Sequence, residues 1–221
     1  MQSIYSIIRP APSSLSDTMQ LLQEAATLHS YDLGIHFDRM LHDFNCLWMI
    51  VRAKVHLQRM PKGEIRIDTW LRSPSSVVSI RDYSIYEDEE EIGYGVYAWT
   101  LVSATERKIV GMKTIPPVME APIRTPERKG SLKRISLPEG LEEAAVWTVA
   151  PQEIDSNGHV NNVCYVRHAE ELAPNCTDLE VIFDRECFLG EQIHLLEKDG
   201  FVRGLKESGE ECFRAKFWRE S

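Results

Sequence analysis

Two stretches of the chain repeat one order of secondary-structure signals, and this repetition limits the possible folds more than any other feature of the sequence. In each stretch, a segment with helical spacing of apolar residues precedes about four segments with strand patterning. The connections between the strand segments are short, which favours antiparallel neighbours. A helix and a curved antiparallel sheet each bury one face when they pack together. The sequence therefore predicts an α+β chain made of two fused halves.

The first half begins with a helix that we expect over 14–34. Apolar residues such as Met19 and Leu22 recur there at helical spacing, and Gly34 can end the helix. Segments rich in β-branched and aromatic residues follow at 47–57, 64–71, 76–88 and 92–105. We expect this unit to occupy residues 1–117.

A proline-rich stretch separates the two halves, and we expect a linker over 118–143. The second unit is expected over 144–221. It begins with a strand at 144–154 and a helix at 161–173, which Pro174 ends. Its remaining strands are expected at 179–189, 191–200, 201–209 and 210–220.

The charge balance excludes several classes of partner. With 34 acidic and 25 basic side chains, the formal charge is −9. Nucleic-acid phosphates and anionic lipid surfaces attract basic proteins, so neither is an expected partner. No run of apolar residues approaches the ~20 that a membrane-spanning helix needs, so we expect no membrane span.

The first residues and the cysteines indicate a compartment. The start of the chain lacks the basic residues, apolar run and cleavage site of a signal peptide. The five cysteines are odd in number and form no CxxC pair, which favours reduced thiols over a disulfide or zinc framework. We therefore expect a cytoplasmic protein. We also expect no metal and no other cofactor, because neither an HExxH spacing nor a glycine-rich phosphate loop occurs.

The densest polar cluster lies between the predicted strand at 144–154 and the predicted helix at 161–173. Asp155, Asn157 and His159 are spaced by two, so in an extended segment all three side chains point the same way. The following helix offers unpaired N–H groups and the positive end of its dipole. A carboxylate, an amide, an imidazole and a helix N-terminus are the groups needed to activate water and to hold a developing oxyanion.

A purely structural interpretation of the same segment competes with this one. Asp, Asn and Gly are common turn residues, so Asp155 to Gly158 alone is most often a turn. The addition of His159 and an Asn-Asn pair before an apolar-faced helix makes the catalytic interpretation the stronger one.

The segment from Asp155 to Asn162, followed by Tyr165, resembles the signature of acyl-acyl carrier protein (acyl-ACP) thioesterases, which are double-hotdog enzymes of fatty acid synthesis. Other segments resemble this family in order and spacing. They are Trp48 with Arg52, Pro61 to Glu64, Ile67 to Trp70, Arg81 to Tyr83, Ala98 to Leu101, and Phe183 to Cys187 with Gly190 and Glu191. The resemblance implies two fused hotdog repeats, each a helix packed on a curved antiparallel sheet, and hydrolysis of fatty acyl-ACP.

The resemblance also implies roles for individual residues. Asp155, Asn157 and His159 match the family's catalytic loop, and Glu186 matches the carboxylate that faces this loop. Two mechanisms fit such a site. Glu186 or Asp155 polarises a water that attacks the thioester, or Cys187 is the nucleophile and His159 its base. Adjacent strand residues point to opposite faces, so we expect Glu186 to face the pocket and a water mechanism to operate.

The first half has no counterpart of the catalytic loop, and we expect it to supply the acyl tunnel. Trp48, Trp70 and Trp99 are candidates for the tunnel lining, although for any one of them a plain core aromatic residue is the stronger interpretation. Asn162 and Tyr165 are the candidates for substrate contacts beside the catalytic loop.

The expected partner is an acyl carrier protein, which is acidic, so an acidic chain needs a local basic surface to bind it. Basic side chains cluster in the predicted linker, where an exposed, solvated segment is the competing interpretation. They are Arg124, Arg128, Lys129, Lys133 and Arg134.

Two other functions stay open at this point. One is hydrolysis of acyl-CoA by the same fold, and the other is a non-catalytic acyl-binding hotdog protein. The presence of Asp155, Asn157, His159 and Glu186 together argues against the second. The oligomeric state is also open, because two fused hotdogs form a complete unit that can pair again as a homodimer.

Overall fold

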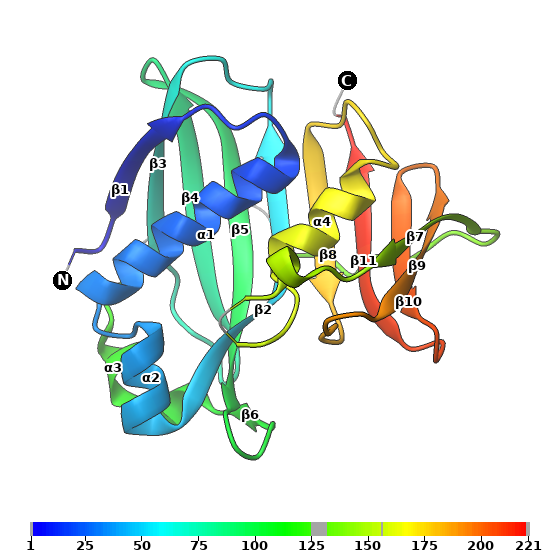
Figure 1. The fold of residues 1–221 in the computed structure, drawn as a ribbon. Helices are drawn as coiled ribbons and strands as arrows, with labels where there is room; N and C mark the ends of the chain where they lie inside the picture. The colour runs from blue at the N-terminus through cyan, green and yellow to red at the C-terminus, as the bar shows by residue number, and fades with distance from the viewer. Residues whose placement is uncertain (1, 125–131, 156, 220–221) are drawn as a thin grey trace.

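The computed structural model describes residues 2–124, 132–155 and 157–219. Its strands form one antiparallel sheet in the order β1-β3-β4-β5-β2-β8-β11-β10-β9-β7, with β6 paired to β5 (Figure 1). The strands of the first half are β1 (Tyr5–Pro10), β2 (Cys46–Leu57), β3 (Glu64–Leu71), β4 (Ser79–Glu87), β5 (Glu90–Ser103) and β6 (Ile109–Val110). Those of the second half are β7 (Glu142–Thr148), β8 (Asp178–Phe183), β9 (Gln192–Lys198), β10 (Phe201–Lys206) and β11 (Glu211–Trp218).

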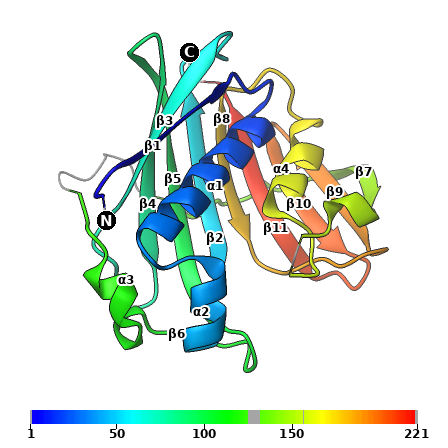
Figure 2. The same ribbon diagram turned by 60° about the vertical axis from the view of Figure 1, so that its left-hand side comes forward.

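Two helices lie on the same side of this sheet, one in each half (Figure 2). These two are α1 (Leu15–Asp32) and α4 (Asn162–Glu170). The described residues also form α2 (Phe37–Phe44), α3 (Pro116–Glu120) and short 3-10 turns at Met112–Thr114 and Pro151–Glu153. α1 crosses the first half of the sheet and α4 the second. This arrangement confirms the predicted α+β fold of two hotdog-like units, each with a helix on an antiparallel sheet.

The sequence explains why α1 forms where it does. The Ser14 hydroxyl accepts a hydrogen bond from the Asp17 N–H and caps the first turn. Leu15, Met19 and Leu22 recur on one face and are completely buried against the sheet. The helix ends before Gly34, whose φ of +65° suits glycine.

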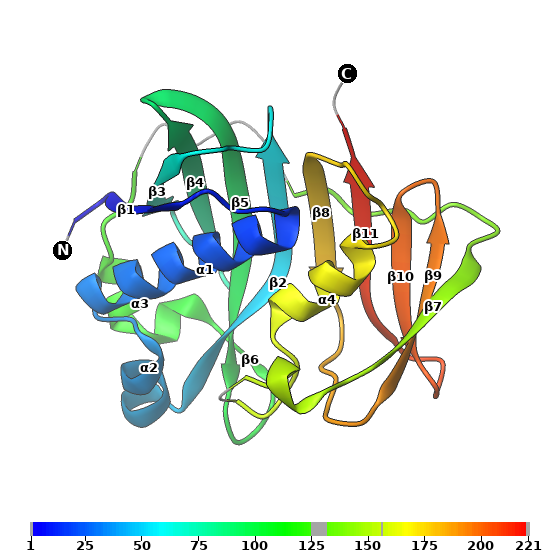
Figure 3. The same ribbon diagram turned by 45° about the horizontal axis from the view of Figure 1, so that its top comes forward.

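The two halves share one sheet and one core. β2 pairs with β8, from Arg52 opposite Ile182 to His56 opposite Asp178. α1 and α4 lie in contact, and the carboxylate of Glu170 in α4 accepts hydrogen bonds from the first N–H groups of α1 (Figure 3). The largest hydrophobic cluster contains residues from both halves.

The structure departs from the sequence expectations at several boundaries. β1 and α2 were not predicted, because β1 buries only Ile7 and α2 buries only Met40, which leaves little apolar periodicity. α3 and the start of β7 lie within the expected linker. The expected strand at 179–189 ends at Phe183, because the N–H groups of Asp184 and Arg185 both turn to the carbonyl of Cys212.

Across the described ranges, no helix combines the length and the apolar character that crossing a membrane requires.

Candidate active site

Asp155 and residues 157–161 form a closed turn between β7 and α4. The Asp155 N–H donates to the His159 carbonyl at 2.8 Å, and Gly158 adopts a φ of +85° inside the turn. The Val160 N–H donates to the Cys187 carbonyl, which ties the turn to the loop after β8. Asn161 then caps α4 by accepting from the Val163 N–H. The turn is thus held from both sides.

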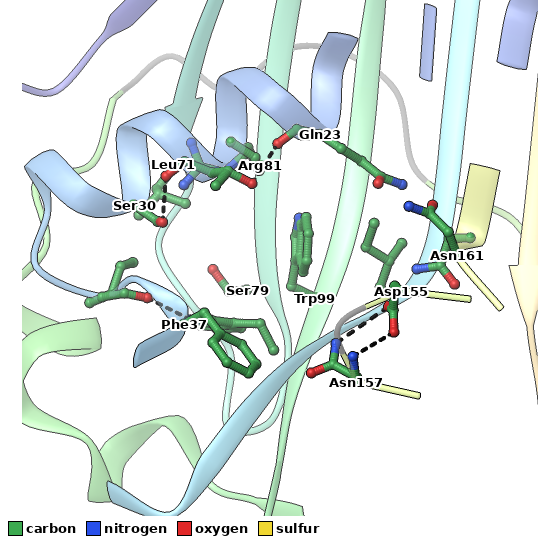
Figure 4. A pocket seen from close by; sticks show the side chains of 16 residues that line it. Gln23, Ser30, Phe37, Leu71, Ser79, Arg81, Trp99, Asp155, Asn157 and Asn161 are labelled. Carbon is green, nitrogen blue, oxygen red and sulfur yellow. Dashed lines mark hydrogen bonds between the residues drawn. The ribbon is translucent and has the colours of Figure 1, made fainter. Parts of the chain in front are cut away.

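Polar side chains from this turn and from the loop after β8 converge on His159. Nδ1 of His159 lies 3.9 Å from Oδ1 of Asp155, and Nε2 lies 3.4 Å from Oε1 of Glu186. Asp155 also accepts from the backbone and side-chain nitrogens of Asn157, at 2.7 and 3.4 Å (Figure 4). The structure therefore brings together all four predicted catalytic residues, with an imidazole between two carboxylates.

Glu186 is held by a residue from the first half. Arg107, in the turn between β5 and β6, forms an ion pair with Oε2 of Glu186. The other oxygen, Oε1, is buried and makes no hydrogen bond within the described residues. A carboxylate oxygen in this position faces His159 and can accept a proton from a water molecule.

Cys187 points away from this cluster. Its side chain is fully buried, and its N–H donates to the Tyr165 hydroxyl at 2.8 Å. A hydrogen bond with Cys212 lowers the pKa of the Cys187 thiol and raises that of Cys212. Cys187 does not line either of the two cavities that lie beside the turn. The expected opposite orientation of Glu186 and Cys187 is present, although both lie in a loop and not in a strand.

Two cavities meet at the turn. The inner cavity, about 240 Å³, lies under α1, and its walls include Gln23, Trp48, Ile50 and Trp99 (Figure 4). The outer cavity, about 390 Å³, lies between β2, β5 and the loop after β8. The residues common to both are Trp48, Ile50, Asp155, Asn157 and Asn162. Asp155 and Asn157 therefore stand at the junction of the two cavities.

The other predicted substrate contacts divide between these cavities. Trp48 and Asn162 line both, Trp99 lines the inner one and Tyr165 the outer one. Trp70 lines neither: it is 4% exposed and lies beneath the guanidinium of Arg124, 4.6 Å from the ring centroid. Trp70 therefore packs against Arg124 and does not line the predicted tunnel.

The predicted carrier-binding residues differ in their exposure to solvent. Arg124 is half-buried on Trp70, whereas Lys133 and Arg134 are exposed. Arg128 and Lys129 lie outside the described residues. Sequence reasoning did not identify Arg107 or Arg81 as site residues, because their roles depend on contacts that no local spacing reveals.

No cluster of three or more metal-ligating side chains occurs in residues 2–124, 132–155 and 157–219. The carboxylates of the turn are instead directed at His159 and at the Asn157 N–H groups.

The sequence is similar to those of several known proteins. The chain is 26% identical over 187 residues to the chloroplastic oleoyl-acyl carrier protein thioesterase of Coriandrum sativum. The aligned region covers 75% of this chain and 49% of that protein. It is 24% identical over 203 residues to oleoyl-acyl carrier protein thioesterase 2 of Arabidopsis thaliana, covering 79% of this chain and 55% of that protein. The chain thus spans about half the length of these curated relatives.

Solved structures show the same fold over nearly the whole chain. An acyl-ACP thioesterase from Bacteroides thetaiotaomicron superposes with a TM-score of 0.83 at 22% identity, covering 99% of this chain and 98% of that one. The 12:0-ACP thioesterase from Umbellularia californica superposes with a TM-score of 0.78 at 18% identity, covering 99% and 97%. Residues 4–115 match the family model described as the acyl-ACP thioesterase N-terminal domain, just over half of the chain. The chain belongs to the acyl-ACP thioesterase family.

Proposed function

We propose that this protein hydrolyses fatty acyl-ACP to a free fatty acid and ACP. The observation that carries the proposal is the position of Asp155 and Asn157 at the junction of two cavities, beside His159 and Glu186. One cavity can hold the acyl chain while the other receives the pantetheine arm, which places the thioester carbonyl at the junction. Family membership supports the same reaction.

The mechanism uses a water molecule. Glu186 accepts a proton from water through Oε1, and the water oxygen bonds to the carbonyl carbon. The amide of Asn157 and the N-terminus of α4 stabilise the oxyanion that develops. The proton on Glu186 passes to Nε2 of His159, which faces Oε1. The tetrahedral intermediate collapses with cleavage of the C–S bond, and His159 delivers this proton to the leaving thiolate, so both residues return to their starting states. The products are one carboxylic acid and one thiol, so no acyl-enzyme forms.

Glu186 is better placed than Asp155 to act as the general base. Asp155 already accepts hydrogen bonds from Asn157 through both carboxylate oxygens, so neither oxygen is left without a partner to receive a proton from water. Oε1 of Glu186 makes no such bond within the described part of the chain. Asp155 therefore orients Asn157 and His159, while Glu186 receives the proton.

Hydrolysis of carrier and CoA thioesters tests the proposal. Purified protein is mixed with acyl-ACP and acyl-CoA of several chain lengths, and free fatty acid is measured by mass spectrometry, which avoids interference from the protein's own thiols. Release from acyl-ACP supports the proposal. Release from acyl-CoA alone would make the protein an acyl-CoA thioesterase, and no release from either by folded protein would favour acyl binding without catalysis.

The carrier is proposed to dock on the basic segment between Arg124 and Arg134. The exposed side chains of Lys133 and Arg134 support this, because the net charge of the chain is otherwise repulsive toward an acidic carrier. The double variant Lys133→Glu/Arg134→Glu should raise the KM for acyl-ACP several-fold and leave acyl-CoA hydrolysis unchanged. Equal effects on both substrates would contradict this docking site.

We also propose that the protein works in a reducing, cytoplasmic environment and pairs as a homodimer. All five cysteines are free thiols, which supports the first part. Sedimentation equilibrium of the purified protein tests the second, and a single monomeric species at micromolar concentration would contradict it.

A further inference from the structure

The inner cavity has a polar wall far from the catalytic turn. Arg81, on β4, lines this cavity and is only 4% exposed. Figure 4 shows Arg81 on one side of Trp99 and the pair Asp155 and Asn157 on the other. An acyl chain that starts at the turn therefore passes Trp99 before it reaches Arg81.

The neighbours that Arg81 contacts are neutral. Its Nη1 donates to Nδ1 of His29 at 2.8 Å and to the hydroxyl of Thr69 at 3.2 Å. Among the described residues, no carboxylate forms an ion pair with it. The adjacent residue, Asp82, is paired with Arg72 through two bonds of 2.7 Å. The charge of Arg81 is thus buried without a counterion.

His29 cannot be that counterion and does not share the charge. It is buried, its Nε2 is bonded to the carbonyl of Gln2, and Tyr5 stacks on its ring. Burial and the nearby guanidinium lower the pKa of His29 to about 4, against the weaker opposing effects of the hydrogen bond to Gln2 and of the charge on Asp32. At neutral pH the imidazole is therefore uncharged and accepts from Arg81 through Nδ1.

Several donors on this wall have no acceptor in the protein. The hydrogen bonds of Arg81 leave from Nη1 alone, so Nε–H and both Nη2–H groups stay without a protein acceptor in the described part of the chain. Nε2 of Gln23 is also buried without one, but its amide lies at the other end of the cavity, beside Asn161 (Figure 4). The hydroxyls of Thr27 and Ser30 already donate to backbone carbonyls.

This pattern is unfavourable for a plain alkyl chain. A methyl terminus packed against the wall would displace water from a buried cation and return no hydrogen bond, which carries a large desolvation cost. An oxygen atom at the same place would accept from the free N–H groups of Arg81. The apolar side chains of Ile50, Leu71 and Trp99 still provide surface for the methylene groups between.

We propose that the inner cavity selects acyl groups that carry an acceptor oxygen on the part of the chain remote from the thioester, and that Arg81 binds this oxygen. A hydroxyl, an oxo group and a carboxylate share this chemistry. The proposal rests on the proposed thioesterase function and defines its substrate class. Arg81 is then a specificity-determining residue, separate from the groups that act on the thioester.

The test compares plain acyl-ACPs, from hexanoyl to dodecanoyl, with ω-hydroxy and ω-carboxy acyl-ACPs of the same lengths. For at least one length, the native protein should show a kcat/KM about tenfold or more higher for an oxygenated chain, as expected for a hydrogen bond to a buried charge. Arg81→Met should abolish this preference, and Arg81→Lys should keep part of it. The matched control is Arg66→Met, because Arg66 stacks on Tyr86 and does not line the cavity. A larger preference for the carboxylate than for the hydroxyl identifies charge pairing as its source.

Calorimetric binding of the free ω-hydroxy and plain fatty acids to the native protein gives a readout that needs neither turnover nor a variant. Tighter binding of the hydroxy acid supports the proposal even if Arg81→Met does not fold. Hydrolysis of plain chains with no preference for oxygenated ones, in either measurement, would overturn this inference and leave the thioesterase function intact. Preferential binding without any thioester hydrolysis would overturn the thioesterase function alone.

Discussion

His159 is the residue around which the proposed chemistry is arranged, because its two ring nitrogens face Asp155 and Glu186. The two carboxylates have different neighbours. Asp155 accepts a hydrogen bond from Asn157, and one oxygen of Glu186 forms an ion pair with Arg107. The same imidazole can therefore be oriented from one side and exchange protons on the other. This division of roles leads to a direct comparison of variants.

Glu186→Gln should reduce kcat for acyl-ACP hydrolysis by roughly 10²-fold or more, because it removes the general base with little change in shape. Asp155→Ala, Asn157→Ala and His159→Ala should each cause losses of about the same order. Cys187→Ser is the matched control and should change kcat little, since this side chain lies in the core. Abolished activity in Cys187→Ser with near-normal activity in Glu186→Gln would establish the cysteine mechanism instead.

His29 makes stability depend on pH in a defined window. Its pKa is lowered from 6.5 to about 4 by burial and by Arg81, so below pH 6.5 the unfolded chain binds a proton that the native state does not. The contribution of His29 to the free energy of unfolding is fully present above pH 6.5 and is lost as pH falls toward 4, by up to roughly 3 kcal/mol. The free energy of unfolding, measured in urea at several pH values between 6.5 and 4, should therefore decrease along this slope. His29→Gln should flatten it, and an unchanged slope in that variant would contradict the assignment.

At the scale of elements, the contact between α1 and the sheet depends on a glycine. A Cβ at Gly95 in β5 would lie 2.6 Å from Leu22 of α1 and 3.1 Å from the ring of Tyr83, both fully buried. Gly95→Ala should therefore destabilise the protein by about 1–3 kcal/mol through overpacking. Gly63→Ala is the control, since its Cβ would meet only Glu87 at an ordinary 3.5 Å. Equal unfolding midpoints for both variants in urea would contradict close packing at Gly95.

The elements also show how far a sequence of this kind can be interpreted. Long segments with clear periodicity, such as α1 and β3, were predicted within one or two residues, because a buried face leaves a regular pattern. The loop after β8 was predicted as strand, since Cys187 and Phe188 look like strand residues and only contacts with β11 end the strand. Within the site, the polar turn could be predicted from spacing. Arg107 and Arg81 could not, because pairing across the sheet brings them to the cavities.

At the scale of the whole molecule, the two halves share one sheet and one core. They share the β2–β8 pairing, in which Val55 lies opposite Leu179, and a single core cluster contains both residues. Residues of the first half line both cavities, and the turn with Asp155, Asn157 and His159 comes from the second half. We therefore expect one calorimetric unfolding transition and no activity from either half alone.

Glu170 connects the halves most directly, because its carboxylate accepts from the N–H groups of Leu15 and Ser16 at 2.7 and 3.0 Å. Glu170→Gln should lower the free energy of unfolding by about 1–2 kcal/mol, as the loss of a charged group at a helix N-terminus does. Glu171→Gln, at the exposed neighbouring position, should have almost no effect. Similar thermal unfolding of both variants would show that this contact does not stabilise the junction.

The claim that the thioester is hydrolysed where the two cavities meet can be tested most directly by a crystal structure with a non-hydrolysable acyl-pantetheine amide. We expect the acyl chain in the inner cavity, the pantetheine arm in the outer one, and the amide carbonyl within hydrogen-bonding reach of Asn157 or His159. An acyl chain outside the inner cavity, or a carbonyl remote from Asp155, Asn157 and Glu186, would contradict it.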